Sequence, residues 1–173
     1  MSTPPDLTAH SIMSVAADDG LAPEQRRLLE AVAARRNVFL TGAAGTGKSF
    51  LIDRVRRRRP LGTFVTASTG IAALSVRGTT LHSWAGLRIV DPETTTFAKM
   101  HTTVASNARA CQRWRDCSLL IVDEVSMVDA FLLDGLDYVA RRVRHRPDHA
   151  FGGVQVLLVG DFFRPVSRRR WCR

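Results

Sequence analysis

The chain has 173 residues, 45% of them hydrophobic, which is enough for one globular domain with a sizeable core. No apolar run approaches the ~20 residues of a membrane span, and the acidic N-terminal segment lacks the apolar region of a secretory signal. The three cysteines form no C-x-x-C pair, so their spacing predicts reduced thiols in an intracellular protein rather than a metal site.

The charge balance is basic, with 25 Lys and Arg against 16 Asp and Glu and a formal net charge of +9. An excess of positive charge favours polyanionic partners, of which nucleic acid is the commonest. A genome composition that favours arginine codons explains the same excess equally well, so charge alone leaves both interpretations open.

The first predicted element is a helix that begins at Pro23, because proline suits the first helical position, where no backbone donor is needed. Leu28, Leu29 and Val32 give this helix an apolar face. Gln25 lies in its first turn, where a surface role is the ordinary interpretation. Residues 1–20 are polar and patternless and are expected to form a flexible tail.

A glycine-rich loop follows, between a predicted strand at 37–41 and a predicted helix at 50–59. It reads Gly42, Ala43, Ala44, Gly45, Thr46, Gly47, Lys48 and Ser49. This G-x-x-x-x-G-K-[ST] spacing, in a strand–loop–helix context, predicts a phosphate cradle of backbone N–H groups at a helix N-terminus. Lys48 is expected to reach the β- and γ-phosphates, and the Ser49 hydroxyl to hold Mg²⁺.

A second strand is predicted at 63–67 and leads into Ser68, Thr69 and Gly70, small residues that favour anionic oxygens at a strand end. The next segment, 77–84, is expected to be a loop that carries hydroxyls, an imidazole and an indole. Such a loop is suited to binding backbone phosphates and stacking bases. Ordinary turn chemistry with Trp84 in the core is the alternative, and spacing alone favours it.

Residues 91–103 are predicted to be a polar surface connection, and 106–116 a short helix with Trp114 as a packing residue. Residues 119–122 are four consecutive apolar β-formers, which predicts a strand buried on both faces of a parallel sheet. Asp123 and Glu124 end this strand, near the glycine loop. Asp123 is expected to steady Mg²⁺, and Glu124 to orient the attacking water or accept its proton.

A longer helix is predicted from the apolar spacing between Val128 and Val143, with Ser126 and Asp129 as its N-terminal cap. His145 and His149 beyond it are expected to be surface residues. Residues 154–159 form the last predicted strand, which ends in Gly160 and Asp161.

Four of these runs together resemble the first motor lobe of the Pif1-like DNA helicases. They are TGAAGTGKS, TASTGIAALSVRGTTLHSWAGL, LIVDEVSMVD and FGGVQVLLVGDFF, and the resemblance covers roughly Leu21 to Phe163. It implies an α/β fold, a P-loop NTPase lobe of the RecA-like type, with a mostly parallel sheet and helices on both faces. The alternative is a P-loop ATPase of another family, such as a clamp-loader relative, and the TASTGIAAL run argues against it.

The resemblance implies an ATP-driven, Mg²⁺-dependent helicase that moves 5′→3′ on single-stranded DNA, with roles in telomere maintenance, recombination and repair. It also implies that Gln25 contacts adenine, and it supports the phosphate, metal and water roles of Lys48, Ser49, Asp123 and Glu124. The residues that fall where the family's first lobe follows the DNA backbone are Ser68, Thr69, Gly70, Thr80 and His82. A monomer without membrane contact is expected, in the nucleus of a eukaryote or alternatively in the mitochondrion.

Two departures from the family pattern leave the activity of the chain itself open. The family continues its last motif as G-D-F-x-Q-L-P-P-V, whereas Arg164 stands here in place of the glutamine that senses the γ-phosphate, or two residues are lost. The 21–166 lobe is followed by an atypical basic segment, 167–173, instead of a second motor lobe with its arginine finger. Because such a finger contributes ~10³–10⁵ in rate, hydrolysis by this chain alone is expected to be very slow. A truncated gene model and a degenerate nucleotide- and DNA-binding remnant are the two explanations.

Overall fold

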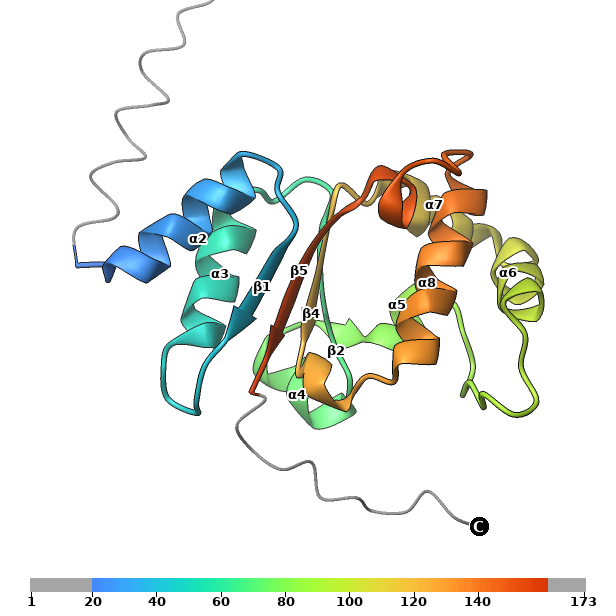
Figure 1. The fold of residues 1–173 in the computed structure, drawn as a ribbon, viewed down its shortest axis with the longest axis horizontal. Helices are drawn as coiled ribbons and strands as arrows, with labels where there is room; N and C mark the ends of the chain where they lie inside the picture. The colour runs from blue at the N-terminus through green and yellow to red at the C-terminus, as the bar shows by residue number, and fades with distance from the viewer. Residues whose placement is uncertain (1–19, 162–173) are drawn as a thin grey trace, which may run out of the picture.

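The computed structural model describes residues 20–161. Their core is a five-stranded sheet in the order β1-β5-β4-β2-β3, and every neighbouring pair of strands is parallel (Figure 1). The strands are β1 (Val38–Thr41), β2 (Thr63–Ala67), β3 (Thr79–Thr80), β4 (Leu119–Asp123) and β5 (Gln155–Gly160). Since all strands run the same way, their carboxyl ends meet at one edge of the sheet.

Helices cover both faces of this sheet, which confirms the predicted α/β class. One face carries α2 (Pro23–Ala33) and α3 (Lys48–Arg58), with the short α4 (Gly70–Ser75) near them in the chain. The other carries α5 (Leu81–Ala85), α6 (Phe97–Ala105), α7 (Ala108–Asp116) and α8 (Ala130–Val143). Two 3₁₀ segments, η2 (Val125–Met127) and η3 (Ala150–Gly153), flank α8 in the chain.

The sheet separates two hydrophobic cores, and β4 contributes to both. Leu119 and Ile121 pack with α2 and α3, whereas Leu120 and Val122 pack with the helices of the opposite face. All five residues of β4 are buried, as the uninterrupted apolar run predicted. This central position fixes Asp123, the last residue of β4, at the middle of the carboxyl edge.

The predicted start of α2 at Pro23 is confirmed, and that of α8 is confirmed in part, because Asp129 caps the helix whereas Ser126 lies in η2. Pro23 opens α2, and the Asp129 carboxylate accepts a hydrogen bond from Phe131 N at the start of α8. Val128 lies before α8 rather than within it. His145 and His149 are exposed.

The prediction of a surface connection over 91–103 is wrong, because α6 occupies Phe97–Ala105. Thr96 caps this helix by accepting a hydrogen bond from Lys99 N, and Met100 and Val104 are buried against the core of α8. The prediction missed this helix because polar residues surround its short apolar stripe, in which Met100 and Val104 are four residues apart.

The segment 77–84 is also not one loop. It forms β3 and most of α5, and Trp84 is 3% exposed within the core, in contact with Trp114 at a ring-centroid distance of 4.5 Å. Base stacking by Trp84 is therefore excluded, and the packing alternative is confirmed for this residue. The expected tail at 1–20, apart from Gly20, lies outside the described residues, as do Arg164 and the basic segment 167–173. No helix within 20–161 has the length and apolarity that crossing a bilayer requires.

Candidate functional site

The glycine-rich loop joins the end of β1 to the start of α3 and curls at the carboxyl edge of the sheet. Gly45 and Gly47 have φ angles of +83° and +87°, a region that side chains rarely adopt. Gly47 is the residue immediately before α3, so it turns the chain into the helix. The Thr46 hydroxyl donates to the Ala43 carbonyl at 2.9 Å and holds the curl closed from within.

The Lys48 side chain folds back into this loop. Its Nζ donates to the carbonyl oxygens of Gly42 at 2.6 Å and Ala43 at 2.9 Å. The ammonium group therefore lies inside the curl, where the first turn of α3 also directs its positive dipole end. Ser49 follows as the second residue of α3, and it is exposed.

The acidic pair lies at the end of β4, across β5 from the loop. Asp123 is 7% exposed, and its Oδ1 accepts a hydrogen bond from Glu124 N at 2.9 Å. Glu124 has a φ of +52°, so the chain turns sharply out of the strand at this residue.

Burial raises the pKa of Asp123, with a further upward effect from the neighbouring Glu124 charge. The Glu124 backbone N–H and the positive charge of Lys48 act against this shift and lower the pKa. β5 pairs in parallel with β1 on one side and with β4 on the other, so the loop after β1 and the acidic pair after β4 lie at the same edge of the sheet. The structure thus brings the glycine loop and the acidic pair together at one edge of the sheet.

Two further side chains adjoin this edge. The Gln25 amide reaches the loop from the first turn of α2, because a Cβ built on Gly47 would lie 3.4 Å from Gln25 Nε2. Asp161 follows β5, the strand between β1 and β4, and is 8% exposed. Its position directly after a buried strand was the signal that could have added Asp161 to the expected site.

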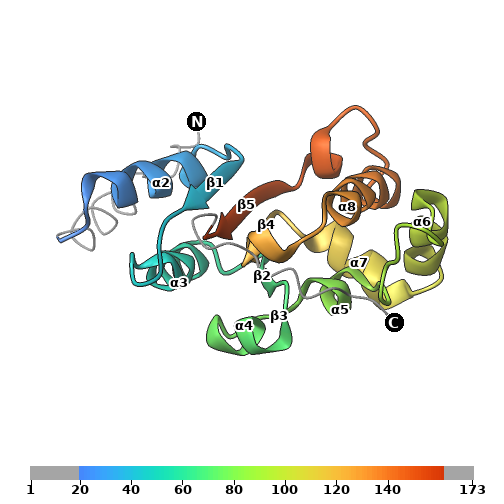
Figure 2. The same cartoon turned by 60° about the horizontal axis from the view of Figure 1, so that its bottom comes forward.

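The remaining expected residues gather around the end of β2. Ala67 of β2 pairs with Thr80 of β3, which places the start of α5 beside the start of α4 (Figure 2). The side-chain oxygens of Thr69 and Thr80 cap these helices by accepting from Ala72 N at 3.2 Å and Ser83 N at 3.3 Å.

The other members of this group differ in exposure. The Ser68 hydroxyl is buried and has no hydrogen-bond partner within the described residues. His82 is partly buried, and burial lowers the pKa of its imidazole, so the ring is neutral at pH 7. Gly70, at the start of α4, is exposed.

Known proteins resemble this chain over most of its length. The family model for PIF1-like helicases matches residues 20–170. An ATP-dependent DNA helicase PIF7 of Trypanosoma brucei brucei is 48% identical over 154 residues, which is 86% of this chain and 15% of that protein.

Two solved structures show the same fold. The Pif1 helicase of Candida albicans has a TM-score of 0.73 at 40% identity, over 83% of this chain and 33% of that one. The Bacteroides Pif1 helicase in complex with ADP-AlF3 and ssDNA has a TM-score of 0.71 at 32% identity, over 86% of this chain and 34% of that one. The chain thus spans about a third of the solved helicase chains and a smaller part of its curated relative. On this evidence, the chain belongs to the PIF1-like helicase family.

Proposed function

We propose that this chain is the ATP-binding motor lobe of an ATP-dependent DNA helicase that moves 5′→3′ on single-stranded DNA. The observation that carries the proposal is that the parallel sheet places the Lys48 loop, after β1, and Asp123, at the end of β4, at the same edge. The Bacteroides relative, which holds ADP-AlF3 and ssDNA in its structure, supports both ligand classes. Roles in telomere maintenance, recombination and repair, and a nuclear or mitochondrial location, belong to the same proposal.

In this proposal the loop from Gly42 to Ser49 surrounds the phosphates of ATP. The Lys48 ammonium exchanges its carbonyl acceptors, Gly42 and Ala43, for phosphate oxygens, which carry more charge. The backbone N–H groups and the N-terminus of α3 add partial positive charge from the other side. Gln25, whose amide lies at the end of the loop, contacts the adenine.

The oxygen donors at this edge suit Mg²⁺, which prefers hard oxygen ligands and keeps several waters. Ser49 and Asp123 would hold the ion, and the described residues contain no cluster of three acidic, His or Cys side chains to form a full protein cage. The bound ion would neutralise charge on the phosphates. Glu124 orients the attacking water, from a position that the turn after β4 fixes.

Single-stranded DNA is proposed to cross the end of β2. Thr69 and Thr80 use their side-chain oxygens as helix caps, so their contribution is to hold the two backbone turns in place. The exposed Gly70 and the neutral His82 imidazole are then the groups best suited to contact phosphates directly.

Replacing His82 with alanine is expected to weaken binding of a labelled oligo-dT about threefold to tenfold, the effect of one hydrogen bond. Fluorescence anisotropy at fixed salt measures the affinity. His145→Ala is the matched control, because His145 is exposed beyond the end of α8, away from β2. Equal affinities of the two variants would contradict the proposed DNA path.

A further inference from the structure

The β2 strand has an open edge over Thr63 and Phe64, before Gly78 closes against the Val65 carbonyl. Within the described residues, β3 pairs only with Thr66 and Ala67, so the first part of β2 has a partner on the β4 side alone. The reason lies in how the chain enters β3. Arg77 has a φ of +51°, and Gly78 lies so close to the Val65 carbonyl that any Cβ there would collide with it. The chain before Thr79 therefore approaches the strand at Val65 instead of continuing along it.

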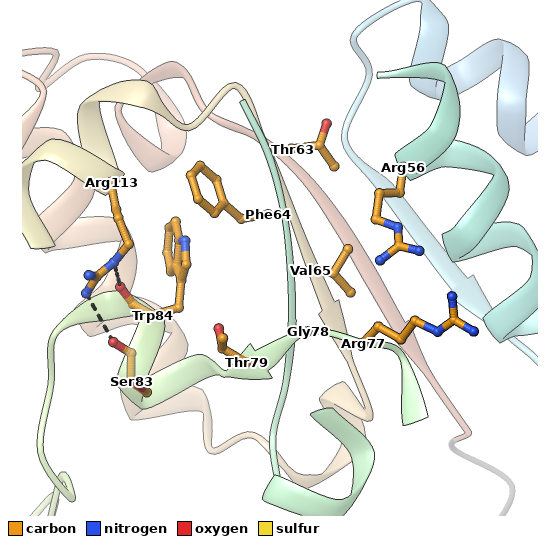
Figure 3. Close-up of a pocket in the computed structure, with 10 residues that line it drawn as sticks. All are labelled: Arg56, Thr63, Phe64, Val65, Arg77, Gly78, Thr79, Ser83, Trp84 and Arg113. Atoms are coloured by element: carbon orange, nitrogen blue, oxygen red, sulfur yellow. Dashed lines mark hydrogen bonds between the residues drawn. The ribbon is translucent and has the colours of Figure 1, made fainter. Parts of the chain in front are cut away.

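A groove of about 370 Å³ lies beside this open edge, a volume within the range of ligand pockets. Phe64 and Trp84 line it on one side of β2, with ring centroids 5.7 Å apart, and Val65 lines it on the other side (Figure 3). The groove thus combines an apolar lining with a strand edge, which presents backbone N–H and C=O groups at regular intervals.

Two buried polar atoms in this lining have no hydrogen-bond partner within the described residues. They are the Thr63 hydroxyl oxygen and the Trp84 indole nitrogen, and both residues line the groove. Buried polar groups without partners are rare in native proteins, and each calls for an explanation. Both atoms are shielded from solvent, so they mark polar groups that the described part of the chain leaves unsatisfied behind the groove and are not themselves contacts for a docked partner.

The positive charge of the groove favours an acidic partner. Arg56, Arg77 and Arg113 line it, and its lining contains no acidic residue (Figure 3). Arg56 is paired with Asp53 at 2.7 Å, and Arg113 donates to the Trp84 and Ser83 carbonyls. Arg77 is exposed; its backbone N–H donates to the Leu74 carbonyl, but its guanidinium makes no hydrogen bond or ion pair within residues 20–161. A negatively charged group therefore finds a guanidinium with free donors at the end of the open edge.

We propose that this groove binds an extended acidic segment of a partner protein, which adds a strand to the open edge of β2. Strand addition supplies backbone hydrogen bonds for affinity, and side-chain pockets supply specificity. A second copy of this chain fits poorly as the partner. Its arginines would lie opposite Arg56, Arg77 and Arg113 across the interface, and like charges repel. Nucleic acid has no backbone donors and acceptors at the spacing of a strand edge. The inference does not rest on the proposed helicase function, since none of the groove residues belongs to the nucleotide site.

The test measures binding of a labelled short peptide by fluorescence anisotropy. The peptide alternates Val and Thr and carries acidic residues at both ends. One control peptide has Lys in place of the acidic residues, and another has N-methyl groups on alternate amides, which removes strand pairing without changing charge. We expect the acidic peptide to bind, the Lys peptide not to bind detectably, and N-methylation to weaken binding at least about tenfold.

Variants of the chain locate the site. Arg77→Ala is expected to weaken peptide binding about threefold to fivefold, the effect of one exposed charge pair. Arg109→Ala is the matched control, because Arg109 is an exposed residue of α7 that does not line the groove. Lys48→Ala should leave peptide binding unchanged, which separates this inference from the nucleotide site.

Several outcomes would overturn the inference. Equal binding of the N-methylated peptide would exclude strand addition, and equal effects of Arg77→Ala and Arg109→Ala would exclude this groove. Displacement of the peptide by oligo-dT, with DNA affinity lost in Arg77→Ala, would assign the groove to nucleic acid. Self-association on size exclusion that Arg77→Ala changes would assign it to a second copy.

Discussion

Replacing Lys48 with alanine is expected to weaken Mg·ATP binding by about 30- to 150-fold, which corresponds to about 2–3 kcal/mol for hydrogen bonds to a charged group. The reason is geometric. Lys48 Nζ lies inside the glycine loop, within 2.9 Å of the Gly42 and Ala43 carbonyls, and no second lysine stands near to replace it. Titration with a fluorescent ATP analogue measures the loss.

The sequence offers a matched control for this change. Lys99 is the only other lysine of the chain, and it is exposed on α6, on the other side of the sheet. Lys99→Ala removes the same charge and should leave ATP affinity unchanged. Undiminished ATP binding in Lys48→Ala, with circular dichroism showing an intact fold, would refute the assignment of the phosphates to this loop.

Replacing Trp114 with alanine is expected to lower the free energy of unfolding by about 3–5 kcal/mol, the range for large-to-small changes in a core. Trp114 is fully buried, packs edge-on against Trp84, and donates from its indole nitrogen to the Ala85 carbonyl at 3.1 Å. Because domains are stable by only about 5–15 kcal/mol, this loss is a large share of the total.

Urea unfolding followed by circular dichroism measures this effect. Trp114→Phe separates its two causes, since it keeps an aromatic ring but leaves the buried Ala85 carbonyl without its donor, a loss of about 1–3 kcal/mol. A change below about 1 kcal/mol in Trp114→Ala would contradict the description of this side chain as the centre of the α5–α8 core.

The sequence predicted the central part of the fold because local signals and burial agreed there. The apolar run before Asp123 is buried on both faces, as four consecutive β-formers require. The predicted limits of β2 match the structure. Prediction failed at α6. Its threonines and lysine made the segment look polar, and its short apolar stripe is recognised as buried only from its packing against α8. Tertiary contacts, which no local pattern contains, decided that element.

The candidate site shows the same division. The glycine loop and the acidic pair were recognisable because each has its own local signature, and the parallel sheet brings them together. In the sequence, the hydroxyls of Thr69 and Thr80 are compatible with two roles, a helix cap or a phosphate contact. In the structure both act as helix caps. The groove beside β2 could not be predicted at all, because it joins Arg56, Arg77 and Arg113 from three separate segments.

The central claim is that one metal–phosphate site spans the glycine loop and the end of β4. Electron paramagnetic resonance of Mn²⁺ with ATP tests it, using Ser49→Ala, Asp123→Asn and the double variant. Asp129→Asn, which makes the same chemical change at an exposed helix cap, is the control.

We expect each single change in the site to weaken Mn²⁺ binding in the presence of ATP at least about tenfold, as metal-site changes commonly do. The double variant should lose less than the product of the two effects, because both residues act on the same ion. Mn²⁺ affinity that is unchanged in Asp123→Asn, or that falls by the full product in the double variant, would contradict the claim that Ser49 and Asp123 hold one ion.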